Sequence, residues 1–186
     1  VLKLSRRNEM NKIDLSWLGA IIDGEGSISC QVYTKKSSGN VRLTPFVCII
    51  NSDEGILSEV ERIITETDYT NFRKVEMKKY YRYEQSRNKK QREETVCFNI
   101  RLDGLTPCYS FLKMIRPYLR STQKQRNADV MMKYISSRKE NGIQRNHLGH
   151  CLRAKYSRKE IKLISSIRTH RTAKSFDEIC QAGNVH

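Results

Sequence analysis

Asp23 and Glu25 are the acidic residues whose position best fits catalytic chemistry. They end a segment, Leu15 to Gly24, whose apolar residues recur at helical spacing, so both carboxylates fall at the C-terminal end of a predicted helix. That end is the negative pole of the helix dipole and disfavours each anion by about 0.3–1 kcal/mol. A bound cation would stabilise them, and oxygen ligands favour Mg²⁺, Mn²⁺ or Ca²⁺ over Zn²⁺. Alone, Gly24-Glu25-Gly26 is equally compatible with a helix stop whose glutamate is a solvated turn residue.

The same helix carries a stripe of small residues. Ser16, Ala20 and Gly24 lie four apart, and Gly19 flanks them. A glycine inside a helix costs about 1 kcal/mol relative to alanine, so close approach of another helix is expected to compensate. The sequence contains only one such helix, and its natural partner is the same helix in a second copy related by a two-fold axis. We therefore predict a homodimer joined through Ser16, Gly19, Ala20, Asp23 and Gly24.

The charge balance points to an anionic partner. The 186 residues include 35 Lys and Arg against 20 Asp and Glu, a net charge of +15, and nucleic acid is the first candidate for relieving it. Solubility alone is the alternative explanation. The sequence has no apolar run long enough to span a membrane and no secretory signal over residues 1–12, so we expect an intracellular protein, cytoplasmic or organellar. Basic surface and hard-cation carboxylates together indicate metal-assisted phosphoryl transfer on nucleic acid.

The cysteines favour neither a disulfide framework nor a zinc site. None of the six forms a CxxC pair, which predicts buried thiols in a reducing compartment. The spacing of His147, His150 and Cys151 could suggest zinc, with only His170 and Cys180 as further candidates, but a clear fourth ligand is lacking. We therefore expect this basic region to contact the DNA backbone instead.

Hydrophobic periodicity predicts an α+β domain over residues 1–136, with the element order α-β-β-α-β-β-α-α. Helices are expected to start at Asp14 as N-cap, at Ser52, and at Thr106 with Pro107 in the first turn, with a fourth over 122–136; strands are expected at 27–36, 41–50, 71–84 and 93–102. Their apolar helix faces are Leu15, Leu18 and Ile22; Ile56, Leu57, Val60, Ile63 and Ile64; and Phe111, Leu112, Ile115 and Leu119. Residues 137–186 are basic and carry all four histidines, and we interpret them as a helical C-terminal extension with helices at 157–168 and 175–182.

The segment Trp17-Leu18-Gly19-Ala20-Ile21-Ile22-Asp23-Gly24-Glu25-Gly26-Ser27-Ile28 resembles the LAGLIDADG motif of the homing endonucleases, with its usual flanks. The resemblance, including the element order, covers roughly residues 13–135. It implies the αββαββα homing-endonuclease fold, with a four-stranded antiparallel saddle that lies in the DNA major groove. One copy of the motif implies a homodimer. The implied activity is site-specific hydrolysis of a long, pseudo-palindromic DNA target, with a staggered double-strand break, by an intron-encoded enzyme.

The resemblance also implies roles for the acidic residues. Glu25, the last acidic residue of the motif, would bind the divalent cations at the scissile phosphates, and the Gly24 carbonyl would help to coordinate them. The expected cofactor is Mg²⁺, for which Mn²⁺ or Ca²⁺ substitutes in binding. Asp23 would cap a neighbouring helix or backbone segment rather than bind metal.

Two further positions bear on catalysis, and one of them departs from the family pattern. Asn51 matches the polar residue that the family often has at the end of the second strand to position water. Thr122 occupies the place where a lysine is often found after the third helix. The resemblance therefore leaves Lys124 or Arg120 to supply the positive charge.

Strand alternation selects a DNA-facing surface rich in Gln, Asn and Arg, side chains that pair with base edges. For any one residue an ordinary solvated strand face is the alternative. The predicted contacts are Ser27, Ser29, Gln31, Tyr33, Lys35, Arg42, Thr44, Cys48, Lys74, Glu76, Lys78, Asn99 and Arg101. Residues 85–92 are expected to form the hairpin loop between the third and fourth strands, and its Arg87, Lys89 and Lys90 are expected to contact phosphates.

Two other functions stay open on this scaffold. An RNA-splicing maturase would bind intron RNA, so RNA is a possible partner beside double-stranded DNA. A DNA-binding regulator with a decayed active site is the third possibility. The presence of Glu25 favours the nuclease over both.

Overall fold

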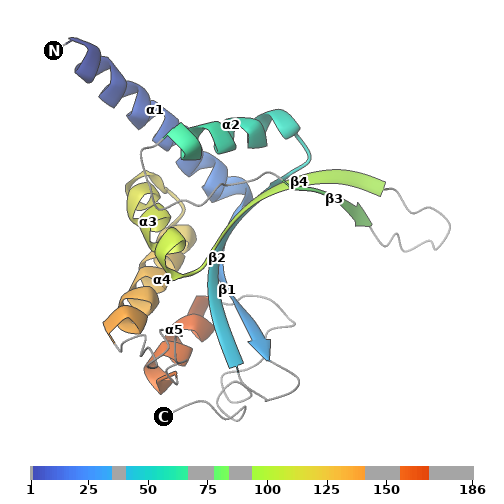
Figure 1. Cartoon of the computed structure of the whole chain (residues 1–186), viewed down its shortest axis with the longest axis vertical. Helices are drawn as coiled ribbons and strands as arrows, with labels where there is room; N and C mark the ends of the chain where they lie inside the picture. The colour runs from blue at the N-terminus through green and yellow to red at the C-terminus, as the bar shows by residue number, and fades with distance from the viewer. Residues whose placement is uncertain (1, 35–40, 67–77, 84–93, 141–155, 168–186) are drawn as a thin grey trace, which may run out of the picture.

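Helices cover one face of a curved four-stranded antiparallel sheet in the computed structural model, which describes residues 2–34, 41–66, 78–83, 94–140 and 156–167 (Figure 1). The helices are α1 (Leu2–Glu25), α2 (Glu54–Glu66), α3 (Leu105–Ile115), the 3-10 helix η1 (Arg116–Tyr118), α4 (Thr122–Glu140) and α5 (Arg158–Ile167). The strands are β1 (Gly26–Thr34), β2 (Val41–Asn51), β3 (Lys78–Tyr83) and β4 (Glu94–Asp103). The predicted α+β class and element order are confirmed.

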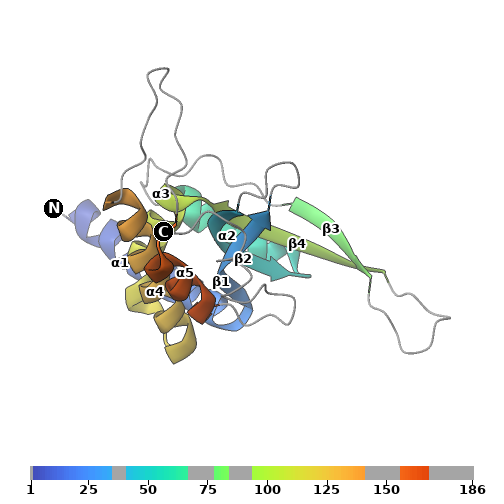
Figure 2. The same ribbon diagram turned by 90° about the horizontal axis from the view of Figure 1, so that it is seen from below.

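The strand order is β1-β2-β4-β3, so β2 and β4 are the inner strands. Ser27 of β1 pairs with Cys48 of β2, and Cys48 pairs in turn with Arg101 of β4. The helices lie on the convex side, and no described helix covers the concave side (Figures 1 and 2). The sheet thus has the saddle form that the motif implies.

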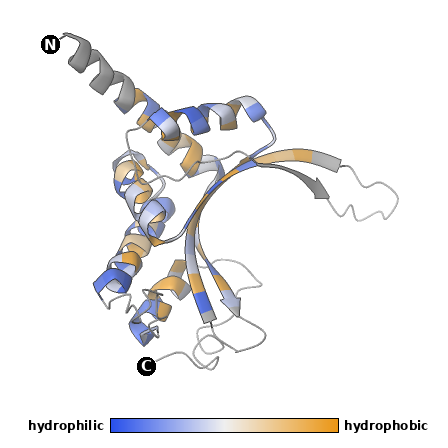
Figure 3. Ribbon diagram, in the orientation of Figure 1, coloured by the Kyte–Doolittle hydropathy of each residue, from blue (hydrophilic) through white to orange (hydrophobic). Residues whose placement is uncertain are grey.

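The core lies between the sheet and the helices, where Figure 3 shows apolar residues on the strands and on the helices that cover them. Leu18 and Ile22 of α1 have no exposed surface, and Ile28 and Cys30 of β1 are each 3% exposed. The other predicted helix faces are buried at Leu57, Val60, Ile63, Ile64, Phe111, Leu112, Ile115 and Leu119, with Ile56 and Leu15 partly buried. The apolar periodicity was therefore a reliable guide to the core.

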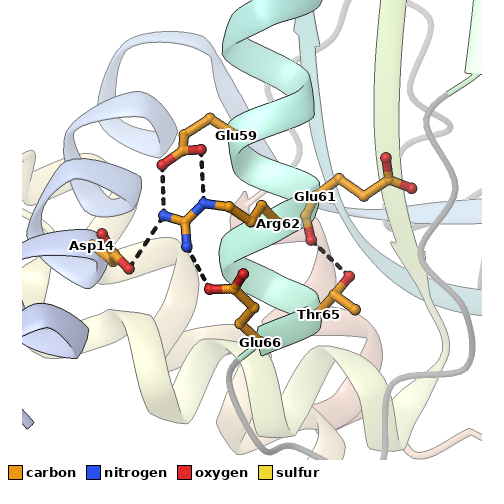
Figure 4. Close-up of polar contacts among 6 residues, drawn as sticks. All are labelled: Asp14, Glu59, Glu61, Arg62, Thr65 and Glu66. Atoms are coloured by element: carbon orange, nitrogen blue, oxygen red, sulfur yellow. Dashed lines mark hydrogen bonds and ion pairs between the residues drawn. The ribbon is translucent and has the colours of Figure 1, made fainter. Parts of the chain in front are cut away.

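Helix α1 starts at Leu2, so the prediction that Asp14 caps it is wrong. Residues 2–13 contain neither glycine nor proline, and nothing in them stops a helix. Asp14 instead accepts a hydrogen bond at 3.3 Å from Arg62 of α2, which also contacts Glu59 and Glu66 (Figure 4). Hydrogen bonding to Glu59 raises the pKa of Arg62, and the same bond lowers the pKa of Glu59. This exposed network ties α1 to α2 without contributing much stability.

Helix α3 also starts earlier than predicted. Its N-cap is Gly104, whose φ of 101° favours glycine, and not Thr106. The Gly104 N–H donates to the Pro45 carbonyl at 2.9 Å, which fixes the turn from β4 into the helix. At α2 the start near Ser52 is confirmed, and the capping side chain is Asp53, whose Oδ1 accepts the Gly55 N–H at 2.8 Å.

The described part of the extension packs on α4 and β1 through α5, whose Ile161, Ile164 and Ile167 are buried in the common core. Ser157 and Glu160 form a reciprocal capping box at its start. The predicted helix at 175–182 lies outside the described residues. None of the described helices has the length and apolarity needed to cross a membrane.

Four of the cysteines, Cys30, Cys48, Cys97 and Cys108, are buried, as predicted. Burial raises the pKa of the Cys108 thiol to about 12. Cys151 and Cys180, with the histidines of the zinc alternative, lie outside the described residues.

Gly19 supplies a stability prediction, because a Cβ at this buried position would lie 2.7 Å from the Tyr118 carbonyl oxygen and 2.9 Å from the Tyr118 Cβ. We expect Gly19→Ala to lower the free energy of unfolding by about 1–3 kcal/mol through overpacking, measured by urea denaturation. Gly24→Ala is the matched control, since a Cβ there would meet nothing within 4 Å. The control should leave the stability of the folded chain unchanged or raise it by up to about 1 kcal/mol. Equal effects of the two changes would contradict this account of Gly19.

Candidate active site

The junction of α1 and β1 presents one carboxylate to solvent. Glu25 is the last residue of α1 and is exposed, and Gly24 beside it is exposed as well. Gly26 is buried, and a Cβ there would lie 2.7 Å from the Ile22 carbonyl oxygen. Glycine at this position lets β1 leave the helix abruptly, so Glu25 stays on the surface at the corner where α1 meets the sheet.

The Asp23 carboxylate binds the backbone of its own chain. Its Oδ2 accepts the backbone N–H groups of Arg120 at 2.6 Å and Ser121 at 3.0 Å, immediately before α4. Its Oδ1 is buried and has no hydrogen-bond partner among the described residues. The carboxylate therefore caps the backbone segment that leads into α4. The resemblance to the motif implies such a capping role for Asp23.

Helix α4 brings a cation to the same corner. The Lys124 ammonium donates a hydrogen bond to the carbonyl oxygen of Gly26, the residue after Glu25. Thr122 and Arg120 are exposed, and the Arg120 backbone is engaged by Asp23. Of the basic residues considered from the sequence, Lys124 is the one whose side chain binds the residue next to Glu25.

Two residues that sequence reasoning missed fasten α4 to β1. Asn127 is 8% exposed, and its amide nitrogen donates to the Ile28 carbonyl at 3.5 Å. Gln123 donates to the Asn127 Oδ1 at 2.8 Å. These contacts cover the free edge of β1 and keep Lys124 close to Gly26, the first residue of that strand. Their only sequence signal was an i, i+4 polar pair on the predicted helix.

Asn51 is the last residue of β2, and its Oδ1 accepts the Asp53 N–H at 2.9 Å. Since Gly26 pairs with Ile49, Asn51 lies at the same end of the sheet as the α1–β1 junction. Its side-chain oxygen forms the turn into α2.

One chain does not assemble a complete metal site from its described residues, which contain no group of three His, Cys, Asp or Glu able to hold an ion. Glu25 and the Gly24 carbonyl are oxygen ligands of the type that Mg²⁺ and Ca²⁺ prefer, but such ions take about six to eight ligands. The donors present fit a hard cation only if water, substrate or a second subunit supplies the rest.

The small-residue stripe of α1 is open to solvent at Ser16, Ala20 and Gly24, with Ile13 beside it 69% exposed. Gly19 corrects the predicted interface. It is buried against Tyr118 of η1, so the close approach that explains this glycine lies within one chain.

The concave face carries many of the predicted DNA contacts. Ser27, Gln31, Tyr33, Arg42 and Arg101 are exposed there, and Ser29, Thr44 and Asn99 are half-buried. Cys48 is only 7% exposed and offers little surface to a ligand. Lys78 pairs with Asn99 in the β3–β4 register. The remaining predicted contacts, Lys35, Lys74, Glu76, Arg87, Lys89 and Lys90, lie outside the described residues.

The Arg101 side chain on this face is held by contacts with several neighbours. It contacts Asp103 and Gln31 and lies over the ring of Phe46. Sequence reasoning missed Phe46 and Asp103, although both follow the same outward alternation. A cavity of about 590 Å³ beside β1 is lined by Gln31, Arg101 and Lys124 among others.

The chain is similar in structure to several solved homing endonucleases. I-CvuI in complex with its target matches with a TM-score of 0.62 at 12% identity, over 93% of this chain and 94% of that chain. The archaeal intron-encoded I-Vdi141I complexed with DNA matches with 0.60 at 11% identity, over 92% and 94%. The LAGLIDADG homing endonuclease I-GzeII in complex with its DNA target matches with 0.59 at 14% identity, over 92% of this chain and 50% of that chain. The chain has the LAGLIDADG homing-endonuclease fold.

One unit of the LAGLIDADG fold accordingly corresponds to nearly all of I-CvuI and to half of I-GzeII. No model of a known protein family matches this chain. No curated protein sequence matches it either. The fold expected from the motif is thus confirmed by three-dimensional similarity.

Proposed function

We propose that this chain is one subunit of a homodimeric, divalent-metal-dependent endonuclease that makes a staggered double-strand break in a long, pseudo-palindromic DNA target. The observation that carries the proposal is the surface at the end of α1, where the exposed Glu25 adjoins the exposed Ser16, Ala20 and Gly24. Pairing two copies of this surface brings two Glu25 carboxylates together and supplies oxygen ligands that one subunit lacks. The motif supports intron encoding as part of the same proposal.

At the reaction centre, Glu25 and the Gly24 carbonyl would hold Mg²⁺. A bound ion would supply Lewis-acid chemistry, polarising the scissile phosphate and lowering the pKa of an attacking water. Lys124, held at the Gly26 carbonyl, places a positive charge beside the phosphate as its negative charge grows. Asn51 stands at the same end of the sheet, where its amide can orient water.

Double-stranded DNA is the proposed substrate because charge and surface chemistry agree. The net charge of +15 supplies salt-dependent attraction to phosphates. Gln31, Asn99 and Arg101 lie on the concave face, with hydrogen-bonding groups suited to base edges. Residues 1–136 form the endonuclease core in this proposal, and residues 137–186 form a basic extension whose described helix packs on α4.

Cleavage should depend strictly on a divalent cation. Duplexes selected for binding from a randomised library in Ca²⁺ should be cut in both strands when Mg²⁺ is added, and sequencing of the ends should show a stagger. Chelation with EDTA should abolish cutting, because water attack on a phosphodiester needs the ion. Undiminished cleavage in EDTA would contradict the metal-dependent mechanism.

The same selection distinguishes the maturase alternative. A chain that selects duplexes and cuts them supports the nuclease. Tight binding to structured intron RNA, with no duplex cut under any divalent cation, would reject the nuclease and favour a splicing role. Sequence-specific duplex binding without cutting would favour the regulator.

A further inference from the structure

Three strands of the saddle converge on Arg101. This residue projects from β4, and its Nη2 reaches across β2 to donate to the Gln31 Oε1 on β1 at 2.9 Å. The guanidinium carbon lies 4.1 Å from the centre of the Phe46 ring on β2. Because β4 is an inner strand, Arg101 lies toward the middle of the concave face and away from its rim.

Asp103 completes the arrangement two residues along β4. The Arg101 Nε donates to its Oδ1 at 2.9 Å and to its Oδ2 at 3.0 Å, and Nη2 lies 2.9 Å from Oδ1. The two side chains are 35% and 49% exposed, so this ion pair contributes little to folding. Its main effect is to restrict where the guanidinium points. We call Gln31, Phe46, Arg101 and Asp103 the Arg101 unit.

The hydrogen bonds of the Arg101 unit decide which groups remain for a ligand. Nε and Nη2 are engaged, while Nη1 has no partner among the described side chains. A guanidinium only donates, so the Gln31 atom that faces it must be the amide oxygen, which turns the amide nitrogen elsewhere. A bidentate contact with adenine needs both atoms of one amide, so Gln31 cannot make it without leaving Arg101. The groups left to the unit are mainly donors.

We propose that the Arg101 unit is a specificity-determining contact that reads a guanine in each half of the DNA target. In the major groove guanine displays two acceptors, N7 and O6, and the donors left to the unit are Arg101 Nη1 and the Gln31 amide nitrogen. Stacking on Phe46 and pairing with Asp103 hold Arg101 in place before DNA binds, so less side-chain freedom is lost on binding. Asp103 acts as a positioning residue. The inference rests on the proposed function, since it assumes that duplex DNA occupies the concave face.

The test compares motifs selected by the full chain from a synthetic duplex library with a randomised centre, in Ca²⁺ so that binding is read without cutting. Wild type should select a guanine at symmetric positions of the two half-sites. Arg101→Lys keeps the charge but removes Nη1 and the planar group that Asp103, Gln31 and Phe46 hold in place. It should lower preference for that guanine about tenfold or more, while the salt dependence of binding stays the same. Asp103→Asn should relax the same position while tightening binding to non-specific duplexes, because an anion is removed. Asn99→Ala, on the same strand and face, is the matched control and should alter a different position.

Several outcomes would overturn the proposal while leaving the endonuclease intact. These are an unchanged motif in Arg101→Lys, loss of preference at an A·T pair instead of a guanine, or an unchanged guanine preference in Asp103→Asn. A wild-type chain that selects no duplex motif would reject both this inference and the proposed function. Circular dichroism of each variant separates loss of readout from loss of fold.

Discussion

Glu25→Gln is expected to lower the rate of DNA cleavage by about a thousandfold or more while leaving DNA binding within a few-fold of wild type. The amide matches the carboxylate in size but carries no charge, so it is a poor ligand for a hard cation. Glu25 is exposed at the end of α1 and makes no described hydrogen bond that the change would break. Folding should therefore be unaffected, and the loss should appear in the chemical step.

The measurement is single-turnover cleavage of a selected duplex in Mg²⁺, with binding measured separately in Ca²⁺. Glu140→Gln, an exposed glutamate at the end of α4, is the control and should cut at the wild-type rate. If Glu25→Gln retains wild-type cleavage, the catalytic centre lies elsewhere. If it loses binding and cleavage together, the carboxylate contributes to DNA affinity or folding and its role has been misassigned.

Ala20→Glu is expected to weaken the dimer by about a hundredfold or more and to abolish double-strand cleavage at protein concentrations where wild type is dimeric. Ala20 lies in the middle of the exposed stripe, one turn from both Ser16 and Gly24. In a two-fold dimer through this stripe, each introduced carboxylate faces its own copy, and like charges opposed in an interface cost several kcal/mol. Glutamate is a good helix former, so α1 itself should persist.

Analytical ultracentrifugation gives the dissociation constant, and cleavage of a supercoiled plasmid carrying a selected site separates single-strand from double-strand cutting. Ser58→Glu, a small-to-acidic change at an exposed position of α2, should leave both unchanged. A dimer of undiminished affinity in Ala20→Glu would place the interface elsewhere. A monomeric variant that still cuts both strands would remove the need for a second Glu25.

Local patterns in the sequence were enough to predict the helices and strands and many of the buried residues of the core. Residues such as Leu18, Ile22, Val60 and Phe111 were identified correctly because helical periodicity reflects one-sided burial, whatever lies on the other side. Element ends were less certain. The start of α1 was misplaced because Asp14 looked like a cap, whereas its carboxylate is used by Arg62, 48 residues further along the chain.

The sequence by itself determined the acidic corner at Glu25, the small-residue stripe and the basic charge, since these depend on residue type and short spacing. Only the tertiary structure decided that Gly19 faces Tyr118 within the same chain, that Lys124 reaches the carbonyl of Gly26, and that Gln31, Phe46, Arg101 and Asp103 form one unit. Each of these contacts joins residues that strand pairing or helix packing brings together from distant parts of the chain. Periodicity shows which way a side chain points, but it carries no information about the neighbour that the side chain meets.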